Sequence, residues 1–246
     1  MSVLLCTITI MKKHKKQSLE IIYEDNHYIA VNKPAGYLVQ GDQTGDLPLS
    51  EMVKEYIKKK YKKPGDVFLG VVHRIDRPVS GVVIFARTTK GLTRLNELFQ
   101  KREVKKLYWA ITDSRPDPLS GHLTHFLFKD KTRNVTKAYQ SQNRNKAAKK
   151  SELDYELLSS LKSQHLIEVK PITGRPHQIR VQLSRINCSI RGDIKYGSNS
   201  KNRDASINLH SRSLSFIHPI KKELVEITAN PPKKDQVWQL FRHLWS

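Results

Sequence analysis

The feature that most constrains the fold is a succession of short apolar segments that resemble β-strands along most of the chain. Segments of this kind cover residues 19–24, 27–32, 68–73, 81–87, 104–112, 152–159 and 165–171. Apolar residues recur at helical spacing in residues 48–62, 89–101, 176–186 and 234–244. Because the strands outnumber the helices and mostly follow one another directly, we predict an α+β fold with a mixed, largely antiparallel sheet flanked by helices and loops.

The charge of the chain indicates its partners. The 246 residues include 44 Lys and Arg against 23 Asp and Glu, which gives a formal net charge of +21. Such a charge is typical of proteins that bind a polyanion, although a surface that serves solubility or a basic ribosome-associated protein would share it. One basic run, residues 143–150, lacks apolar periodicity and is predicted to be a mobile loop.

Cysteine usage and hydropathy bear on the compartment. The two cysteines, Cys6 and Cys188, form no pairing or zinc-binding pattern, which favours a reducing, cytoplasmic setting. The apolar run at residues 3–11 is too short to span a bilayer, and its basic cluster follows it, unlike that of a signal peptide. We therefore expect no membrane association, and no sequence pattern requires more than a monomer.

The domain organisation follows from length and pattern. We expect residues 1–18 to form a basic, disordered N-terminal tail and residues 19–246 to form one catalytic-size domain.

Residues 71–87, VVHRIDRPVSGVVIFAR, place a carboxylate among cations between two apolar runs. A buried, unpaired carboxylate costs several kcal/mol, so Asp76 requires a cation or hydrogen-bond donors nearby. Arg74 and Arg77 are close in sequence, but a strand, a turn and a second strand would splay them to different sides. We therefore expect a partner from elsewhere in the chain. The alternative is an ordinary turn aspartate that caps its own loop.

A second stretch, PITGRPHQIRVQLS, is predicted to begin a helix with Pro176 in its first turn. Arg180 lies beside the apolar stripe of this helix, so it would be presented at a fixed place. An exposed arginine on an amphipathic helix is the alternative. The stripe consists of Ile179, Leu183 and Ile186, and the neighbouring polar stripe of His177, Arg180 and Ser184.

In the strand VKKLYWAIT, alternation places Tyr108 on the face opposite to Trp109. Tyr108 can thus face a site while Trp109 faces the core, although a simply packed strand tyrosine would show the same pattern.

Together these stretches resemble the RluA-type pseudouridine synthases. VVHRIDRPVSGVVIFAR is similar to that family's H-R-L-D-x-x-T-S-G-L-L-L-F-A-K, and GRPHQIRVQL is similar to its G-R-T-H-Q-I-R-V-H-L. Four further pieces occur in the family's order, namely YEDNHYIAVNKPAG (23–36), KKLYWA (105–110), GDIKYG (192–197) and LHSRSLSFIHP (209–219). The resemblance implies the pseudouridine synthase fold and isomerisation of uridine to pseudouridine in ribosomal or transfer RNA, with base flipping and without a cofactor or a metal.

The resemblance also implies roles for individual residues. Asp76 matches the family's catalytic aspartate, Tyr108 its active-site tyrosine, and Arg180 the arginine that pairs with the aspartate. Arg74 matches the residue that takes the place of the flipped base. The residues expected to bind RNA or to assist base flipping are Arg74, Arg77, Arg175 and His177. The match begins near residue 20, so no S4-type RNA-binding module is expected before the domain.

Four positions depart from the family pattern, namely Val79, Pro176, Gln182 and Ser211. We expect Pro176 and Gln182 to reshape RNA contacts near Arg180. A glycosidase would need two carboxylates across the scissile bond, and a metal nuclease would need clustered acidic or histidine ligands. The sequence pattern offers neither near Asp76. The remaining alternative is a non-catalytic RNA-binding or ribosome-assembly protein on the same fold.

Overall fold

The computed structural model describes residues 19–245, so the tail expected at residues 1–18 lies outside the described residues. The strands are β1 (Glu20–Glu24), β2 (Tyr28–Lys33), β3 (Gly70–Val71), β4 (Ser80–Ala86), β5 (Lys105–Thr112), β6 (Ser120–Asp130), β7 (Val135–Tyr139), β8 (Lys149–Leu161), β9 (Gln164–Pro171), β10 (Leu209–Ile217) and β11 (Leu224–Thr228). The helices are α1 (Leu49–Lys60), α2 (Thr89–Gln100), α3 (Gln178–Arg185) and α4 (Gln236–Gln239), with short 3-10 helices η1 (Gln142–Arg144), η2 (Ile194–Tyr196) and η3 (Arg242–Leu244).

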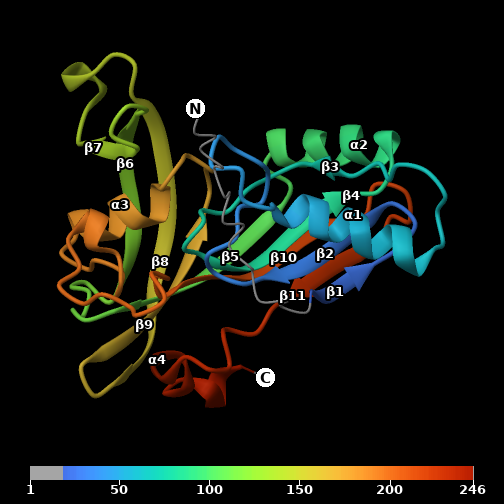
Figure 1. The fold of residues 1–246 in the computed structure, drawn as a ribbon. Helices are drawn as coiled ribbons and strands as arrows, with labels where there is room; N and C mark the ends of the chain where they lie inside the picture. The colour runs from blue at the N-terminus through green and yellow to red at the C-terminus, as the bar shows by residue number, and fades with distance from the viewer. Residues whose placement is uncertain (1–18, 246) are drawn as a thin grey trace, which may run out of the picture.

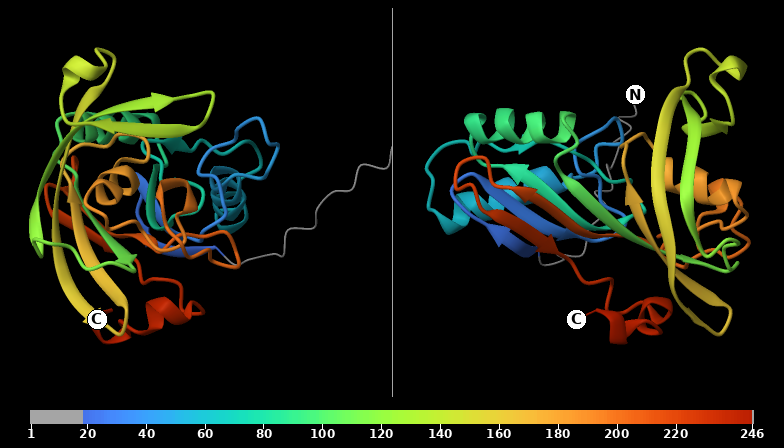
Figure 2. Two further views of the ribbon diagram at one scale, coloured as in Figure 1. Left: turned by 90° about the vertical axis from the view of Figure 1, so that its left-hand side faces the viewer. Right: turned by 180° about the vertical axis from the view of Figure 1, so that it is seen from behind.

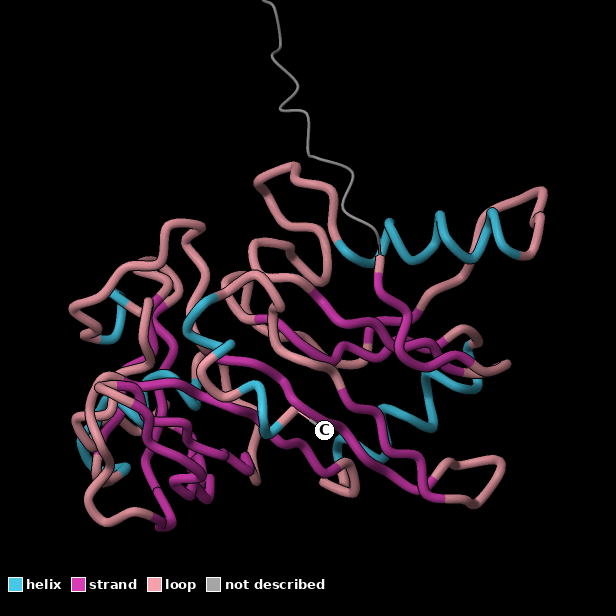
Figure 3. The backbone as a smooth tube through the Cα atoms, turned by 90° about the horizontal axis from the view of Figure 1, so that it is seen from below, coloured by secondary structure: helices cyan, strands magenta, loops and turns pink. Residues whose placement is uncertain are grey.

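All eleven strands belong to one sheet, whose main order is β1-β2-β4-β10-β5-β9-β8-β6-β7. Strand β11 pairs with β10, and the two-residue β3 pairs with β4. Only the short β4–β10 contact is parallel, so the predicted α+β fold with a mixed, largely antiparallel sheet is confirmed. Strands β6, β7 and β8 stand away from the β1–β2–β4 end, in the view of Figure 1 and from below in Figure 3. We call residues 120–161, which contain these three strands, the arm.

Helices cover both faces of the sheet. Helices α1 and α3 pack on one face, where Val53 and Leu183 join one large hydrophobic cluster with Val83. Helix α2 packs through Leu95 on the opposite face (Figure 1). The C-terminal segment covers the same opposite face near β5, where Trp109 joins a separate cluster. Among residues 19–245, no helix combines the length and the apolar character that a bilayer crossing requires.

The boundaries correct the sequence-based predictions in several places. The strand predicted at 68–73 shrinks to β3, because the chain leaves the sheet to form the loop that carries Asp76. The helix predicted at 234–244 breaks into α4 and η3. Strands β6, β7, β10 and β11 escaped prediction. In β10 the buried polar residues His210, Ser211 and Arg212 confine apolar alternation to the second half of the strand, which leaves a short signal.

Buried His210 gives the fold an acid limit. It is fully buried, its Nδ1 lies 2.8 Å from Ser80 Oγ, and its Nε2 lies 3.0 Å from the Ala229 carbonyl oxygen. Burial lowers the pKa of His210 to about 4, below its ordinary value of about 6.5. Between these two values the unfolded chain binds a proton that the folded chain does not bind. The stability that neutral His210 contributes is therefore fully present above pH about 6.5 and is lost as the pH falls toward 4.

We expect the free energy of unfolding to fall by on the order of 3 kcal/mol for His210 across this window, as measured by urea unfolding at several pH values. His210→Gln is expected to be less stable at pH 7 and to show a flatter pH profile than the wild type. The control is His122→Gln, since the His122 side chain is 46% exposed. An unaltered profile in His210→Gln would show that other groups set the acid limit.

Candidate active site

Arg180, which lies 104 residues after Asp76 in the sequence, contacts Asp76 in the folded chain. Ile179 and Leu183 bury one side of α3 in the large cluster, which fixes the helix against the sheet. Arg180 Nη1 then donates to Asp76 Oδ2 at 2.9 Å. The partner expected from elsewhere in the chain is therefore Arg180, and the simple turn-capping arrangement is wrong.

A second carboxylate, Asp193, holds Arg180 in place. Arg180 Nε donates to Asp193 Oδ2 at 2.6 Å and Nη2 donates to Oδ1 at 2.8 Å, a bidentate pair. The side chains of Asp193 and Arg180 are 1% and 6% exposed. Burial opposes the charge on Arg180, but hydrogen bonds and charge from Asp193, reinforced by Asp76, raise the pKa of Arg180. Arg180 is thus a preorganised cation with one nitrogen directed at Asp76.

Asp76 is accessible where Asp193 is not. Its side chain is 28% exposed, and the contact with Arg180 uses only Oδ2. Within residues 19–245, Oδ1 of Asp76 has no hydrogen-bond or ion-pair partner. The carboxylate therefore has one oxygen fixed by a cation and one oxygen open to a ligand.

A buried lysine, Lys33, forms hydrogen bonds to the backbone of the loop that carries Asp76. Lys33, fully buried at the end of β2, donates through Nζ to the carbonyl oxygens of Pro34 (3.1 Å), Tyr37 (2.9 Å) and Arg77 (3.2 Å). Burial lowers the pKa of Lys33 to about 7, and the charge of Asp76 opposes this shift. Lys33 therefore ties β2 to the turn that presents Asp76. Neither Lys33 nor Asp193 was predicted as a site residue, although they lie in the family-like segments 23–36 and 192–197.

The predicted RNA-contacting arginines differ in their surroundings. Arg77 donates to the Gly36 carbonyl oxygen at 2.9 Å and pairs with Asp46 at 2.6 Å, so it holds the segment before α1 against the Asp76 loop. Arg74 and Arg175 are exposed, and their side chains form no hydrogen bond or ion pair within residues 19–245.

Tyr108 lies in the middle of β5, within the electrostatic influence of Asp76. It pairs with Ser211 of β10, which in turn lies opposite Gly81 of β4. Burial raises the pKa of Tyr108 to about 12, a hydrogen bond with Ser211 opposes the shift, and the negative charge of Asp76 adds to it. Trp109 faces the C-terminal cluster instead, so the predicted division of the two faces of β5 is confirmed.

Gly81 explains how β4 and β10 come so close at Ser211. Its φ is +114°, a backbone conformation that favours glycine, and a Cβ at this position would lie 2.3 Å from the Ser211 carbonyl oxygen. A side chain at this position would therefore separate the strand that carries Ser211 from the strand that follows the Asp76 loop.

His177 belongs to the wall of the site. It adopts a left-handed conformation (φ +54°) just before α3, so the helix begins at Gln178 and the predicted start at Pro176 is wrong. Its Nε2 lies 3.1 Å from Lys129 Nζ and 3.9 Å from Asp76 Oδ2. Burial lowers the pKa of His177 to about 4, and Asp76 opposes the shift. Lys129, from β6, is a further cation near Asp76, and it was not predicted from the sequence.

Gln182 is a departure from the family pattern that the structure explains. It is fully buried, and its Nε2 donates to the carbonyl oxygens of Leu123 (3.1 Å) and Ser151 (3.3 Å). Gln182 therefore ties α3 to the arm. Because its side chain is inaccessible, Gln182 cannot contact RNA directly, and any effect on RNA contacts would pass through the position of α3.

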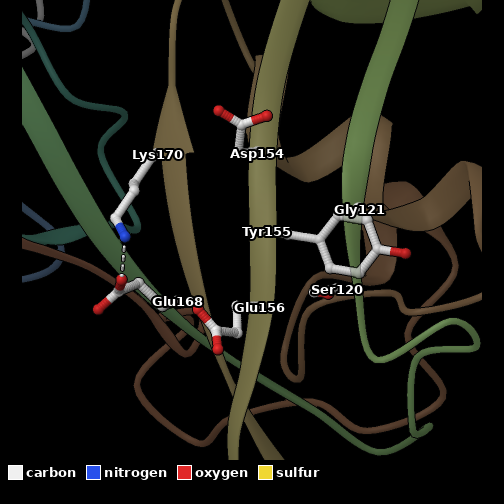
Figure 4. Close-up of a pocket in the computed structure, with 7 residues that line it drawn as sticks. All are labelled: Ser120, Gly121, Asp154, Tyr155, Glu156, Glu168 and Lys170. Carbon is white, nitrogen blue, oxygen red and sulfur yellow. Dashed lines mark ion pairs between the residues drawn. The ribbon is translucent and has the colours of Figure 1, made fainter.

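A separate hollow of about 300 Å³ lies on the outer side of β6, β8 and β9 (Figure 4). Glu168 in this hollow pairs with Trp109 in the strand register, so its side chain shares the face of Trp109 and not that of Tyr108. Three carboxylates make the hollow unsuitable for RNA phosphates. Its lining residues are Ser120, Gly121, Asp154, Tyr155, Glu156, Glu168 and Lys170.

Comparisons with known proteins agree with this arrangement. The family described as RNA pseudouridylate synthase matches residues 27–185. The chain is 34% identical to the ribosomal large subunit pseudouridine synthase D of Zymomonas mobilis, over 92% of this chain and 73% of that protein. It is 30% identical to the tRNA pseudouridine synthase C of Haemophilus influenzae, over 90% of this chain and 95% of that protein.

A solved structure extends the likeness to the fold. Human RNA pseudouridylate synthase domain containing 4 superimposes with a TM-score of 0.74 at 27% sequence identity, over 91% of this chain and 92% of that chain. Motifs, site geometry, sequence relatives and fold therefore agree that this chain belongs to the RNA pseudouridylate synthase family, with relatives of the RluA type.

Proposed function

We propose that this protein isomerises specific uridines of ribosomal or transfer RNA to pseudouridine, with Asp76, Tyr108 and Arg180 as the residues of the reaction centre. The observation that carries the proposal is the carboxylate of Asp76, with one oxygen fixed by Arg180 and the other open. The reaction breaks the N1–C1′ bond, turns the uracil and joins C5 to C1′. N1 gains a proton and C5 loses one, so the product has the atoms of the substrate and no co-reactant is required.

The charge of the protein supports RNA as the substrate. A net charge of +21 supplies the sequence-independent attraction to phosphates, while the site acts on one nucleotide. A stacked uridine must leave its helix before a carboxylate can reach its sugar. All three proposed reaction residues come from one chain, which supports action as a monomer, and we expect the protein to act in the cytoplasm.

Arg74 is suited to fill the space that the flipped uridine leaves. It is exposed, has no partner within residues 19–245, and stands two residues before Asp76. Flipping costs a few kcal/mol in a stacked stem and much less in an unstacked strand. Arg74→Ala is therefore expected to slow turnover more on a folded stem-loop than on a short unstructured RNA with the same uridine. Equal defects on both substrates would make Arg74 an ordinary phosphate contact.

Tyr108→Phe removes only the hydroxyl, whose pKa is raised by burial and by the charge of Asp76 and lowered by a hydrogen bond with Ser211. The ring remains, so we expect the melting temperature to change little, whereas turnover should fall by about 100-fold or more if the hydroxyl takes part in proton transfer. The control is Tyr155→Phe, whose hydroxyl donates to the Pro118 carbonyl oxygen away from Asp76. A fully active Tyr108→Phe protein would mean that the tyrosine only packs.

The test of the proposed function is a map of pseudouridine across all cellular RNA with and without the protein. The named relatives modify ribosomal large subunit RNA or transfer RNA, so we expect specific positions in one of these RNAs to lose the modification. Complementation with Asp76→Asn should fail to restore them. An unchanged map in the absence of the protein would favour the alternative, a non-catalytic RNA-binding or ribosome-assembly protein.

A further inference from the structure

The arm carries an exposed basic segment that lies outside the reaction centre. Residues 131–150 contain seven lysine and arginine residues and no aspartate or glutamate. All seven are exposed, and they are Lys131, Arg133, Lys137, Arg144, Lys146, Lys149 and Lys150. The segment covers β7, the loop with η1, and the start of β8, at one extreme of the molecule (Figures 1 and 2). Exposed cations at this density are complementary to a phosphate backbone.

Three aromatic side chains lie among these cations. The strand register places Phe126 of β6 between Tyr139 of β7 and Lys150 of β8, and places Phe128 opposite Lys137. Directly paired residues share a face, and so do residues two apart in a strand. The three rings and the two lysines therefore share one face of the arm, which we call the aromatic face.

The aromatic face is turned away from α3. The intervening residues Leu127 and Ala138 project to the other face, where they pack with Val181 of α3. The three rings are partly exposed, and they belong to none of the four hydrophobic clusters formed by residues 19–245. Partly exposed rings interleaved with lysine are the arrangement on which single-stranded nucleic acids stack their bases.

The same strand links the aromatic face to the reaction centre. Lys129 follows Phe128 and projects to the opposite face, where its Nζ lies 3.1 Å from His177. Along β8, the face bearing Lys150 becomes acidic from Glu152, which pairs with Lys150 at 2.6 Å, and continues so at Asp154 and Glu156, around the hollow of Figure 4. Only the end of this face that carries Phe126, Phe128 and Tyr139, on the opposite side of β6 from Lys129 and the site, is therefore complementary to RNA.

We propose that the aromatic face is a second RNA-binding surface, which holds unpaired nucleotides beside the target uridine. Bases stack on Phe126, Phe128 and Tyr139, while Lys137 contacts the phosphates. This inference rests on the RNA pseudouridine synthase function proposed above. It adds that the substrate presents single-stranded RNA to the arm.

The test measures affinity for a short oligoadenylate, which contains no uridine, and for a uridine-free duplex, at several salt concentrations. The double variant Phe128→Leu with Tyr139→Leu keeps apolar side chains and removes two rings. It is expected to bind the single strand more weakly by about fivefold or more per ring, with an unchanged salt slope. Lys137→Gln, at an exposed position, should instead lower the slope by about 0.7. The control Phe68→Leu removes a ring that is 45% exposed outside the arm and should change neither quantity.

Turnover separates this inference from the proposed function. The double variant should retain wild-type turnover on a minimal stem-loop that contains the target uridine and lacks flanking single strands. Unchanged affinity of the double variant for oligoadenylate, or an equal loss on single strand and duplex, would overturn the second surface even if the wild-type protein makes pseudouridine. If the wild-type protein makes none in any RNA, the proposed function fails whatever the binding data show.

Discussion

Asp76→Asn is expected to abolish pseudouridine formation while the protein still binds RNA. The amide keeps the shape of the carboxylate but removes its charge and its capacity to act as a base or nucleophile. A positioned acid or base typically contributes 10²- to 10⁴-fold to a rate, so we expect a loss of about that size or greater. Phosphate contacts supply most of the affinity for RNA, so the Kd should change by no more than about twofold.

The matched control for this variant is Asp46→Asn. Asp46 pairs with Arg77 near the same loop at 2.6 Å but lies outside the contact with Arg180. This control should retain turnover close to that of the wild type. Retained turnover in Asp76→Asn, or equal losses in both variants, would remove Asp76 from its proposed role.

Arg180→Ala is expected to cost both activity and stability, and the stability loss should come chiefly from Asp193. The Asp193 side chain is 1% exposed and that of Asp76 is 28% exposed, so alanine leaves one fully buried charge without its cation. Breaking a buried pair in this way costs about 3–5 kcal/mol. Denaturant unfolding of the variant at pH 7 measures this loss directly.

A double variant separates the two roles of Arg180. Arg180→Met with Asp193→Leu removes the buried pair together, and replacing such a pair by apolar residues is often nearly neutral for stability. We expect the double variant to recover most of the stability lost in Arg180→Ala but none of the turnover. Unchanged stability in Arg180→Ala, or recovered turnover in the double variant, would contradict the arrangement described here.

The sequence predicted the contact between Asp76 and Arg180 better than it predicted the residues that support this contact. The pairing of Asp76 with Arg180 was predicted from the family resemblance, whereas the residues alone indicated only a partner for Asp76 from elsewhere in the chain and a helix that presents Arg180 at a fixed place. Asp193 was not predicted, because 13 residues separate it from Arg180 and only the folded η2 region brings the two together. Lys33 reads as an ordinary basic residue until folding surrounds it with backbone carbonyl groups.

The strands that escaped prediction share a physical cause. Sequence-based strand prediction depends on apolar alternation, whereas β10 buries His210, Ser211 and Arg212. Their polar groups are satisfied by contacts that only the fold supplies, such as the donation from Arg212 to the Ala229 carbonyl oxygen at 2.7 Å. In β6 the pattern is obscured because both faces carry apolar residues, with Phe126 and Phe128 facing outward and Leu123 and Leu127 facing inward.

The central claim is that this chain alone exchanges the N1 and C5 attachments of uridine. The most direct measurement uses cellular ribosomal or transfer RNA, isolated from cells without the protein, that carries tritium at C5 of uridine. Purified protein, without added metal or nucleotide, is incubated with this RNA. We expect release of tritium to water in equal amount to the pseudouridine formed, and no release with Asp76→Asn. RNA binding without tritium release, or release that persists in Asp76→Asn, would contradict it.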